Sequence, residues 1–213
     1  MQSLETIYDR LYHAYGPQHW WPAATPFEVM VGAVLTQNTA WSNVEKAIAS
    51  LKNANCLDAR DIILLPDKQL AKLIRPSGYF NIKAKRLKNL CRWFTGQGGF
   101  KLLSKMETRI LRLSLLDVNG VGPETADDIL LYAFNRPVFV IDIYTRRLFV
   151  RFGLITGTED YETLRGYFES ALKPDVRLFN EYHALIVRHA KEKCTLQDEC
   201  RHCLIEAPLV TDN

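Results

Sequence analysis

The sequence lacks any long run of apolar residues and any apolar segment behind a basic amino terminus. A membrane-spanning helix needs roughly 18 or more consecutive apolar residues, and a secretory leader needs an apolar core. The first residues, MQSLETIYDRLYHAYG, instead mix acids, bases and aromatics. We therefore expect an intracellular protein with no membrane partner.

Cysteine is also scarce, and its distribution is uneven. Five cysteines in 213 residues are too few for a secreted scaffold held by disulfides. Three of them, Cys194, Cys200 and Cys203, lie close together near the end of the chain, which indicates a metal site or the remnant of one. Cys56 and Cys91 have apolar neighbours, so we expect both to be small core residues.

A strong excess of one charge is missing as well. The chain has 27 Lys and Arg against 24 Asp and Glu, a net charge of +3, which permits an anionic partner without requiring one. Hydrophobic residues make up 47% of the chain, enough to bury a core in one compact unit or two small ones. The composition is that of a folded globular protein.

Alternation of polar and β-branched residues is absent, and apolar residues recur at helical spacing along most of the chain. The fold class predicted is all-α. Thr25-Pro26-Phe27-Glu28 has the pattern of a capping box, and it opens a helix whose inner face would be Phe27, Met30, Val31, Val34 and Leu35. Further helices are expected at 43–51, from 66 to a stop at Pro76-Ser77-Gly78, at 81–94, and near 107–115, 123–134, 143–152, 160–172 and 177–192.

The expected helix 81–94 carries several basic residues. Its apolar spacing places Ile82, Leu87, Leu90 and Phe94 inward and leaves Lys83, Lys85, Arg86 and Lys88 mostly to solvent. These cations, together with Arg146 and Arg147, are candidates for phosphate contacts, although each is individually typical of a solvated surface.

The most informative segment is Leu115-Leu116-Asp117-Val118-Asn119-Gly120-Val121-Gly122-Pro123-Glu124-Thr125-Ala126, between two expected helices. Glycine allows positive φ and close approach of another molecule, and the helix that starts at Pro123 presents unpaired N–H groups. Such a turn is able to hold a phosphate through its backbone. Taken alone, it is equally an ordinary helix–helix turn.

A single carboxylate, Asp142, follows the apolar run Val138–Ile141 and stands at the head of the next expected helix. Helix capping explains an acid at such a position when it is considered alone. Hairpin, helix, apolar run and Asp together, in this order, resemble the helix-hairpin-helix-plus-Asp signature of the endonuclease III superfamily of DNA glycosylases. The resemblance extends from Phe27 through Cys203.

The resemblance implies two segments that enter opened DNA. Leu35-Thr36-Gln37-Asn38-Thr39 resembles the segment whose Gln fills the gap left by an extruded base. Pro76-Ser77-Gly78-Tyr79-Phe80-Asn81 resembles the loop whose bulky residue wedges into the base stack. Filling the hole offsets the stacking lost when a base is flipped out. On spacing alone, Gln37 is equally a polar helix break, and Tyr79 or Phe80 a buried loop aromatic.

The resemblance also assigns catalytic residues. Asp142, ionised, would stabilise the oxocarbenium-like sugar and activate the attacking water. Bifunctional members carry a lysine where this chain has Glu124, and a carboxylate cannot form the Schiff base that precedes strand cleavage. We therefore expect a monofunctional DNA N-glycosylase without lyase activity. Glu124 is a second catalytic candidate, or only a favourable carboxylate in a first helical turn.

Three tryptophans bear on the substrate. His19-Trp20-Trp21-Pro22 and Trp41, with the Gln-Asn-Thr and Pro-Ser-Gly-Tyr-Phe runs, resemble the 3-methyladenine DNA glycosylase branch of the superfamily. A methylated adenine is cationic, and electron-rich aromatic faces attract a cationic ring. Trp20, Trp21 and Trp41 are therefore candidates for the base pocket, with a core position as the ordinary alternative.

The cysteines near the end of the chain fit the family less well. Members with a [4Fe-4S] cluster use four cysteines spaced C-x6-C-x2-C-x5-C, whereas Cys194, Cys200 and Cys203 give C-x5-C-x2-C and Leu209 takes the fourth place. Three alternatives remain open. Either His202 or His189 completes the ligand set, or zinc takes the place of iron, or the cysteines are a remnant that binds no metal.

The family layout implies two helical lobes with a DNA-binding cleft between them. We expect residues 23–135 to form the lobe with the hairpin, and 1–22 with 136–213 to form the second. The expected function is excision of alkylated purines such as 3-methyladenine from double-stranded DNA in base excision repair, by a monomer that is cytoplasmic and nucleoid-associated if bacterial. The alternatives are an endonuclease III-like glycosylase for another lesion, an oxidised pyrimidine or a mismatch, and a non-catalytic DNA-binding module.

Overall fold

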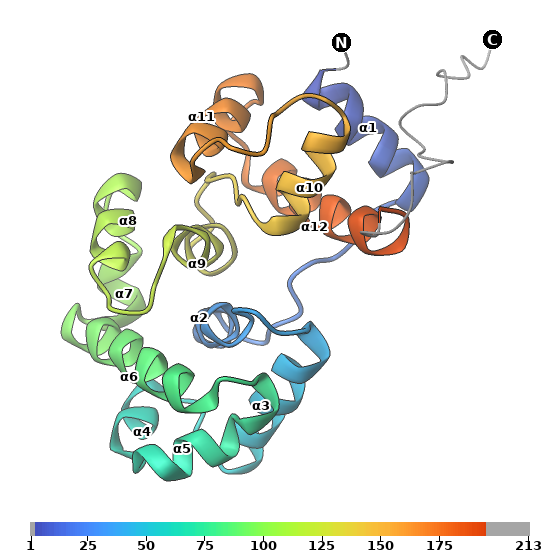
Figure 1. Ribbon diagram of the computed structural model, residues 1–213. Helices are drawn as coiled ribbons and strands as arrows, with labels where there is room; N and C mark the ends of the chain where they lie inside the picture. Colours follow the sequence, from blue (N-terminus) through green and yellow to red (C-terminus); the bar gives the residue numbers. More distant parts are fainter. Residues whose placement is uncertain (1–2, 195–213) are drawn as a thin grey trace. The chain divides into compact units, whose positions relative to one another are not determined.

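The computed structural model describes residues 3–194, and every regular element in that range is helical (Figure 1). The predicted all-α fold class is confirmed. The chain divides into two compact units, one formed by residues 1–22 and 137–213 and the other by residues 23–136. We call them unit 1 and unit 2. No helix within residues 3–194 combines the length and the apolar character needed to cross a membrane.

Unit 1 contains four described helices, α1 (Leu4–Tyr15), α10 (Ile143–Arg151), α11 (Tyr161–Ala171) and α12 (Val176–Glu192). Helix α12 packs against both α1 and α10. Aromatic rings fill the space between them: Phe139 stacks on Phe168 with ring centroids 4.4 Å apart, and the edge of Phe179 meets Phe139 at 5.2 Å. These rings are fully buried, so this cluster is the core of the unit.

Unit 2 is built around α2 (Pro26–Leu35), which packs against α3, α6, α9 and η2 (Figure 1). The remaining elements are α3 (Trp41–Asn53), α4 (Ala59–Leu64), α5 (Asp67–Leu73), the 3-10 turn η1 (Arg75–Ser77), α6 (Phe80–Gly96), α7 (Gly99–Leu103), α8 (Thr108–Leu116), α9 (Pro123–Asp128) and the π-helical turn η2 (Ile129–Ala133). Eight consecutive residues of α2, from 28 to 35, are buried, and residues 29–35 are accordingly apolar on every side of the helix.

The predicted start of α2 is confirmed in detail. Thr25 Oγ1 accepts a hydrogen bond from the backbone N–H of Glu28 at 3.1 Å, which is the first half of a capping box. The Glu28 carboxylate accepts from the N–H of Ala24 at 3.2 Å, one residue earlier than in the usual motif. Glu28 is buried, and its charge is balanced by Lys52 Nζ at 2.7 Å.

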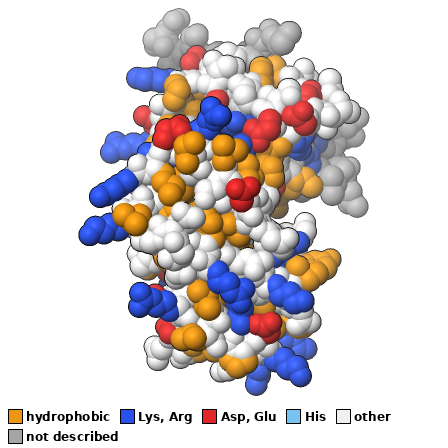
Figure 2. All heavy atoms as spheres, turned by 90° about the vertical axis from the view of Figure 1, so that its left-hand side faces the viewer, with side chains coloured by type: hydrophobic (Ala, Val, Ile, Leu, Met, Phe, Trp, Pro, Cys, Tyr) orange, Lys and Arg blue, Asp and Glu red, His pale blue; other side chains and the backbone are white. Residues whose placement is uncertain are grey.

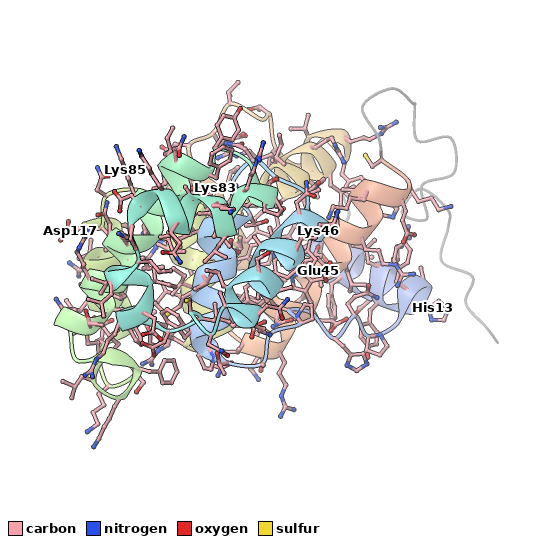
Figure 3. The ribbon with its side chains drawn as sticks, turned by 90° about the horizontal axis from the view of Figure 1, so that it is seen from below. His13, Glu45, Lys46, Lys83, Lys85 and Asp117 are labelled. Carbon is pink, nitrogen blue, oxygen red and sulfur yellow. The ribbon has the colours of Figure 1, made fainter. Side chains whose placement is uncertain are left out.

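Helix α6 contradicts the predicted pattern of inward and outward residues. Lys83 and Lys88, expected in solvent, are 1% and 6% exposed, whereas Ile82, expected in the core, is 52% exposed. Each lysine is buried because its ammonium reaches backbone carbonyls at the ends of neighbouring helices. Lys85 is exposed as expected, and Figure 3 shows it beside the buried Lys83. Helical spacing does not reveal such partners in advance.

Helix positions are otherwise close to those expected, with three additions. Helices α1, α4 and α7 were not predicted, and the expected helix 123–134 consists of α9 followed by the π-helical turn. The expected helix that begins at residue 66 ends at Leu73 and is followed by the 3-10 turn. Cys91 is buried as predicted, but Cys56 is half-buried in a loop, where its thiol lies 3.0 Å from the carbonyl of Ala54.

Candidate active site

Asp142, the catalytic candidate in unit 1, directly follows a buried segment of the chain. Residues 138–141 are buried, and Asp142 is the N-cap of α10 with extended backbone. Its Oδ1 accepts the backbone N–H of Thr145 at 2.7 Å. Unpaired N–H groups and the helix dipole stabilise an anion at this place, so α10 holds the carboxylate in its ionised form.

A histidine from α12 faces the other oxygen of this carboxylate. His183 Nε2 lies 3.5 Å from Asp142 Oδ2, and both side chains are buried. Burial alone would raise the pKa of Asp142, but His183 and the hydrogen bond from Thr145 together hold it below its usual value. Asp142 is therefore a carboxylate at neutral pH.

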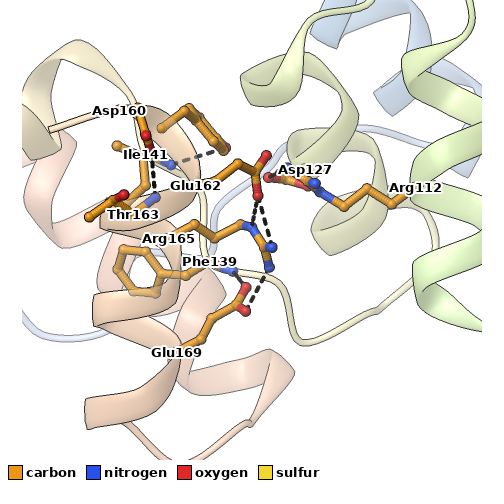
Figure 4. A network of polar contacts seen from close by, with 10 residues as sticks. Arg112, Asp127, Phe139, Ile141, Asp160, Glu162, Thr163, Arg165 and Glu169 are labelled. Atoms are coloured by element: carbon orange, nitrogen blue, oxygen red, sulfur yellow. Dashed lines mark hydrogen bonds and ion pairs between the residues drawn. The ribbon is translucent and has the colours of Figure 1, made fainter.

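The backbone that leads to Asp142 is fixed by α11. Glu169 Oε1 accepts the N–H of Phe139 at 2.9 Å, and the hydroxyl of Tyr161 lies 3.4 Å from the N–H of Ile141 (Figure 4). Arg165 holds Glu169 in place with a hydrogen bond of 2.7 Å to its second oxygen. The extended segment has no strand partner among residues 3–194, so these side chains satisfy backbone groups that a sheet would otherwise pair.

The hairpin between α8 and α9 contains two glycines with different requirements. Gly120 has φ of +100°, and a Cβ there would lie 2.2 Å from Arg86 Cγ, so the fold itself demands glycine. Gly122 has φ of −91°, and a Cβ there would meet nothing within 4 Å. Nothing in the described chain therefore requires glycine at 122. Val121 between them is buried.

Gln37 lies against this hairpin. Its Nε2 donates to the carbonyl of Gly120 at 3.1 Å and to Thr125 Oγ1 at 2.9 Å, while its Oε1 accepts from Arg86 Nη1 at 2.5 Å. The structure thus brings together Gln37 and the Gly-Val-Gly turn, which lie 83 residues apart in the sequence.

The two aromatic residues of the predicted wedge loop differ sharply. Tyr79 is 69% exposed, with a left-handed backbone at φ of +43° just before α6. Phe80 begins α6, is half-buried, and lines a shallow pocket of about 250 Å³ whose other walls are Lys68, Ala71, Lys72, Arg75 and Asn81. Of the two candidates, Tyr79 is therefore the side chain that projects into solvent.

Glu124 and the tryptophans occupy varied surroundings. Glu124 is exposed in the first turn of α9. Trp41 is half-buried at the start of α3 in unit 2, where its Nε1 donates to Glu45 at 3.1 Å. Trp20 and Trp21 are half-buried in the segment that follows α1 in unit 1. The Trp20 Nε1 is buried and has no hydrogen-bond acceptor among residues 3–194.

The predicted metal ligands are described only in part, because Cys200 and Cys203, with His202 and Leu209, lie outside the described residues. Cys194 is buried, and Arg151 Nη1 lies 3.5 Å from its sulfur. Burial lowers the pKa of His189 to about 4, and its Nδ1 lies 2.9 Å from the Tyr15 hydroxyl. Residues 3–194 contain no cluster of three His, Cys, Asp or Glu side chains suited to a metal. The [4Fe-4S] cluster stays a prediction.

Basic side chains do not mark a binding surface by themselves. On the face drawn in Figure 2, Lys and Arg are interspersed with apolar and acidic side chains. Arg146 and Arg147, candidates for phosphate contacts, donate to the carbonyls of Glu159 at 2.7 Å and Ala190 at 2.6 Å. Both guanidinium groups thus already serve the fold of unit 1.

Sequence reasoning missed the residues that hold the candidates in place. His183, 41 positions after Asp142, and Thr125, 88 positions after Gln37, have no local signal that links them to those side chains. Lys83 and Arg86 were visible as cations but assigned to solvent. A buried polar partner becomes recognisable only when the helices that carry it are packed.

Comparison with known proteins agrees with this fold and these motifs. Residues 31–174 match the family described as HhH-GPD superfamily base excision DNA repair protein. A Methanocaldococcus jannaschii protein, provisionally named a DNA repair glycosylase, is 47% identical over 208 residues, 96% of this chain and 94% of that one. The chain therefore belongs to the HhH-GPD superfamily of DNA repair glycosylases, and the predicted place in the endonuclease III superfamily is confirmed.

Solved structures show the same fold. The H. pylori 3-methyladenine DNA glycosylase, solved with bound 1,N6-ethenoadenine, is 32% identical with a TM-score of 0.79, over 92% of this chain and all of that one. An endonuclease III solved in a non-covalent complex with DNA has a TM-score of 0.80 at 20% identity, over 96% of this chain and 94% of that one. The second likeness concerns the fold alone.

Proposed function

We propose that this protein is a monofunctional DNA glycosylase that removes alkylated purines such as 3-methyladenine, with Asp142 as its catalytic carboxylate. The observation that carries the proposal is a buried, ionised Asp142, held by the start of α10 and faced by His183. A carboxylate that is buried and kept charged is arranged to act on a developing positive charge.

The chemistry follows from the charge of Asp142. As the bond between the sugar C1′ and the purine nitrogen breaks, positive charge develops on the sugar, and the carboxylate stabilises it. Water then bonds to C1′ and gives up a proton, for which Asp142 is the acceptor. A 3-methylated adenine is cationic in DNA and departs as a neutral base, so the leaving group needs no general acid. One buried carboxylate is sufficient for this reaction.

Glu124 supports the monofunctional form of the proposal. Bifunctional relatives of this family carry a lysine at this position, and its amine forms the Schiff base that leads to strand cleavage. Glu124 supplies no amine, and it is exposed in the first turn of α9. We assign it a secondary role, as a carboxylate near the DNA, and expect no lyase activity.

Double-stranded DNA is the proposed partner of a monomeric protein, and three features of unit 2 support it. Tyr79 projects from the structure as a wedge would. Gln37 is held at the hairpin, as a side chain that fills an emptied base position would be. Gly122 leaves the backbone of the hairpin open to close approach by a phosphate.

The choice of alkylated purines rests on the aromatic residues and one relative. Trp20, Trp21 and Trp41 are each proposed as candidates for contact with the base, and Trp20 in unit 1 carries the proposal. Its buried Nε1, without an acceptor among the described residues, suits a site that receives a polar ring. The H. pylori relative, named a 3-methyladenine glycosylase, holds an ethenoadenine in its solved structure. Aromatic faces favour a cationic purine over a neutral base.

The test is release of free base from methylated duplex DNA by the wild-type protein and by Asp142→Asn, with strand breaks assayed before and after alkali. We expect 3-methyladenine from the wild type only, with breaks only after alkali. Duplexes with an oxidised pyrimidine or a mismatched base form the comparison panel.

Each other outcome points to a different function. Release from one of the comparison duplexes alone would identify a glycosylase for another lesion. Breaks without alkali would contradict the monofunctional assignment. DNA binding without release of any base, unchanged in Asp142→Asn, would identify a non-catalytic binding module.

A further inference from the structure

The strongest feature of unit 2 outside the proposed catalytic residues is a row of polar side chains on one side of α6. Lys83 and Arg86 are three residues apart, so they project from the same side of the helix. Each bonds to a segment that the proposed function places against DNA. The row continues with Asn89, whose Nδ2 donates to the carbonyl of Asn119 in the hairpin at 3.1 Å.

Lys83 joins the two segments predicted to enter the base stack. Its Nζ donates to the carbonyl of Leu35 at 2.8 Å and to the carbonyl of Ser77 at 2.6 Å. Leu35 is the last residue of α2, two positions before Gln37, and Ser77 ends η1, two positions before Tyr79. One buried ammonium therefore fixes the backbone at the base of both candidate insertion residues.

The location suits a cation. The final carbonyls of α2 have no partner within the helix, and the negative end of the helix dipole lies there. Burial, and then the positive charge of Arg86, lower the pKa of Lys83 to about 8, so the ammonium form predominates at neutral pH. The side chain is 1% exposed, which leaves it out of direct contact with DNA.

Arg86 joins Gln37 to the hairpin. Its Nη1 donates to Gln37 Oε1 at 2.5 Å, and Gln37 Nε2 in turn donates to the carbonyl of Gly120. The Cβ, Cγ and Cδ atoms of Arg86 occupy the space over Gly120 that any larger residue would need, since a Cβ at position 120 would lie only 2.2 to 2.9 Å from them. Gln37 is thus oriented by contacts within the protein itself.

We propose that Lys83 and Arg86 are positioning residues that lock the Gln37 segment, the Tyr79 turn and the hairpin into one rigid DNA-engaging unit. This inference rests on the proposed function, since it assigns a task to side chains that hold its insertion segments. Preorganisation of this kind avoids the cost of ordering loops when DNA binds. A displacement of about 1 Å at a positioned group is enough to lower a rate by about 100-fold.

The same helix supplies a matched control. Lys88 is also buried, which contradicts the contact with a phosphate expected from the sequence. Its Nζ also donates to a backbone carbonyl, that of Leu65, and to the Asp67 carboxylate. Leu65 follows α4 and Asp67 begins α5, so both lie away from the Gln37 segment, the Tyr79 turn and the hairpin in sequence. Loss of either lysine removes a buried cation from α6, but only Lys83 holds the proposed DNA-engaging segments.

The experiment compares Lys83→Met with Lys88→Met in the full-length protein. Methionine keeps most of the side-chain volume and deletes the charge. Four quantities are measured: thermal unfolding, affinity for undamaged duplex, fluorescence of 2-aminopurine placed beside the lesion as a readout of base flipping, and single-turnover release of 3-methyladenine at saturating enzyme.

We expect both variants to unfold at a lower temperature, because each leaves buried carbonyls without a donor. Lys83→Met should lose at least tenfold in the flipping signal and the single-turnover rate, with affinity for undamaged duplex changed less than threefold. Lys88→Met should flip and release base as the wild type does. Equal rates in the two variants, at a temperature where both are folded, would overturn the inference.

A second variant keeps the test decisive if Lys83→Met does not fold. Arg86→Met removes the bond to Gln37 from a half-exposed position, so it should fold, and we expect a similar loss of flipping. Wild-type flipping and rate in Arg86→Met would overturn the positioning role. If the wild-type protein releases no base, the proposed function is wrong. If the wild type is active and the Lys83 and Arg86 variants are equally active, only the positioning role is wrong.

Discussion

Each unit buries a charged side chain that the end of a helix satisfies, the anion Asp142 in unit 1 and the cation Lys83 in unit 2. In unit 1 the anion Asp142 accepts an N–H at the start of α10, where the helix presents unpaired donors. In unit 2 the cation Lys83 donates to the carbonyl that ends α2, where the helix presents unpaired acceptors. In both units the end of a helix stabilises a buried charge, but the two charges differ in the role that we propose for them.

The difference lies in what remains available to a substrate. Among residues 3–194, Asp142 Oδ2 is faced by His183 at 3.5 Å, whereas the Lys83 ammonium makes two short bonds to carbonyls. The pKa of Asp142 lies below its usual value, so its carboxyl group is ionised at neutral pH. A carboxylate with one oxygen facing a histidine suits catalysis, and an ammonium bonded to two backbone carbonyls suits structural support.

The largest effect is expected at the anion. Asp142→Asn keeps the cap on α10 but removes the charge, so the single-turnover rate of base release should fall by about 1,000-fold. The free energy of unfolding should change by less than about 1 kcal/mol, because Asn is as good an N-cap as Asp. Rapid-quench kinetics and urea unfolding measure the two quantities.

Asp160→Asn is the matched control for that variant. Asp160 caps α11 with the same geometry, an Oδ1 that accepts the N–H of Thr163 at 2.7 Å (Figure 4). We expect wild-type activity from it. An equal loss of rate in both variants would mean that capping, and not the position of Asp142, explains the effect.

The hairpin of unit 2 offers the next largest effect, on stability. Gly120→Ala forces a Cβ to within 2.2 Å of Arg86 Cγ at φ of +100°, and should lower the free energy of unfolding by about 2–4 kcal/mol. In Gly122→Ala the new Cβ meets no atom within 4 Å, so the free energy of unfolding should change by less than about 0.5 kcal/mol. Binding to duplex DNA should nevertheless become weaker. Urea unfolding and fluorescence anisotropy provide the two measurements. Wild-type DNA affinity in Gly122→Ala would refute an approach of DNA to this turn.

The buried ammonium of Lys83 should make the free energy of unfolding depend on pH. Below pH 8 Lys83 is protonated in both the folded and the unfolded chain, and above its ordinary pKa of 10.5 it is neutral in both. Between these values the unfolded chain binds more protons, so a rise in pH stabilises the fold, by at most about 3 kcal/mol. The difference in unfolding free energy between wild type and Lys83→Met, measured from pH 7.5 to 10.5, should therefore grow. A constant difference would show that Lys83 keeps an ordinary pKa.

The smallest effect is expected at Glu124. Glu124→Gln removes an exposed first-turn carboxylate, so we expect less than about 1 kcal/mol of destabilisation. The rate of base release should fall by less than about tenfold, far less than in Asp142→Asn. Neither wild type nor variant should cut DNA without alkali. A fall in the rate of base release as large as that of Asp142→Asn would show that Glu124 is as important for catalysis as Asp142.

Local chemistry explains which features could be predicted. The Thr25 cap, the turn glycines and the N-cap position of Asp142 depend on a few neighbouring residues, and each is present as expected. Helix α6 shows the limit of such reasoning. The apolar Ile82 and the charged Lys83 exchanged their expected places, because two carbonyls from α2 and η1 outweigh the hydrophobic pattern at one position.

By itself, the sequence determined the helical class of the fold, the family and the identity of the candidate residues, because spacing, caps and turns are local properties of the chain. Only the tertiary structure decided which charges are buried and what satisfies them: His183 beside Asp142, Arg86 on Gln37 and Lys83 between α2 and η1. The reason is physical. The free energy of a buried charge depends on partners that packing brings from distant parts of the sequence.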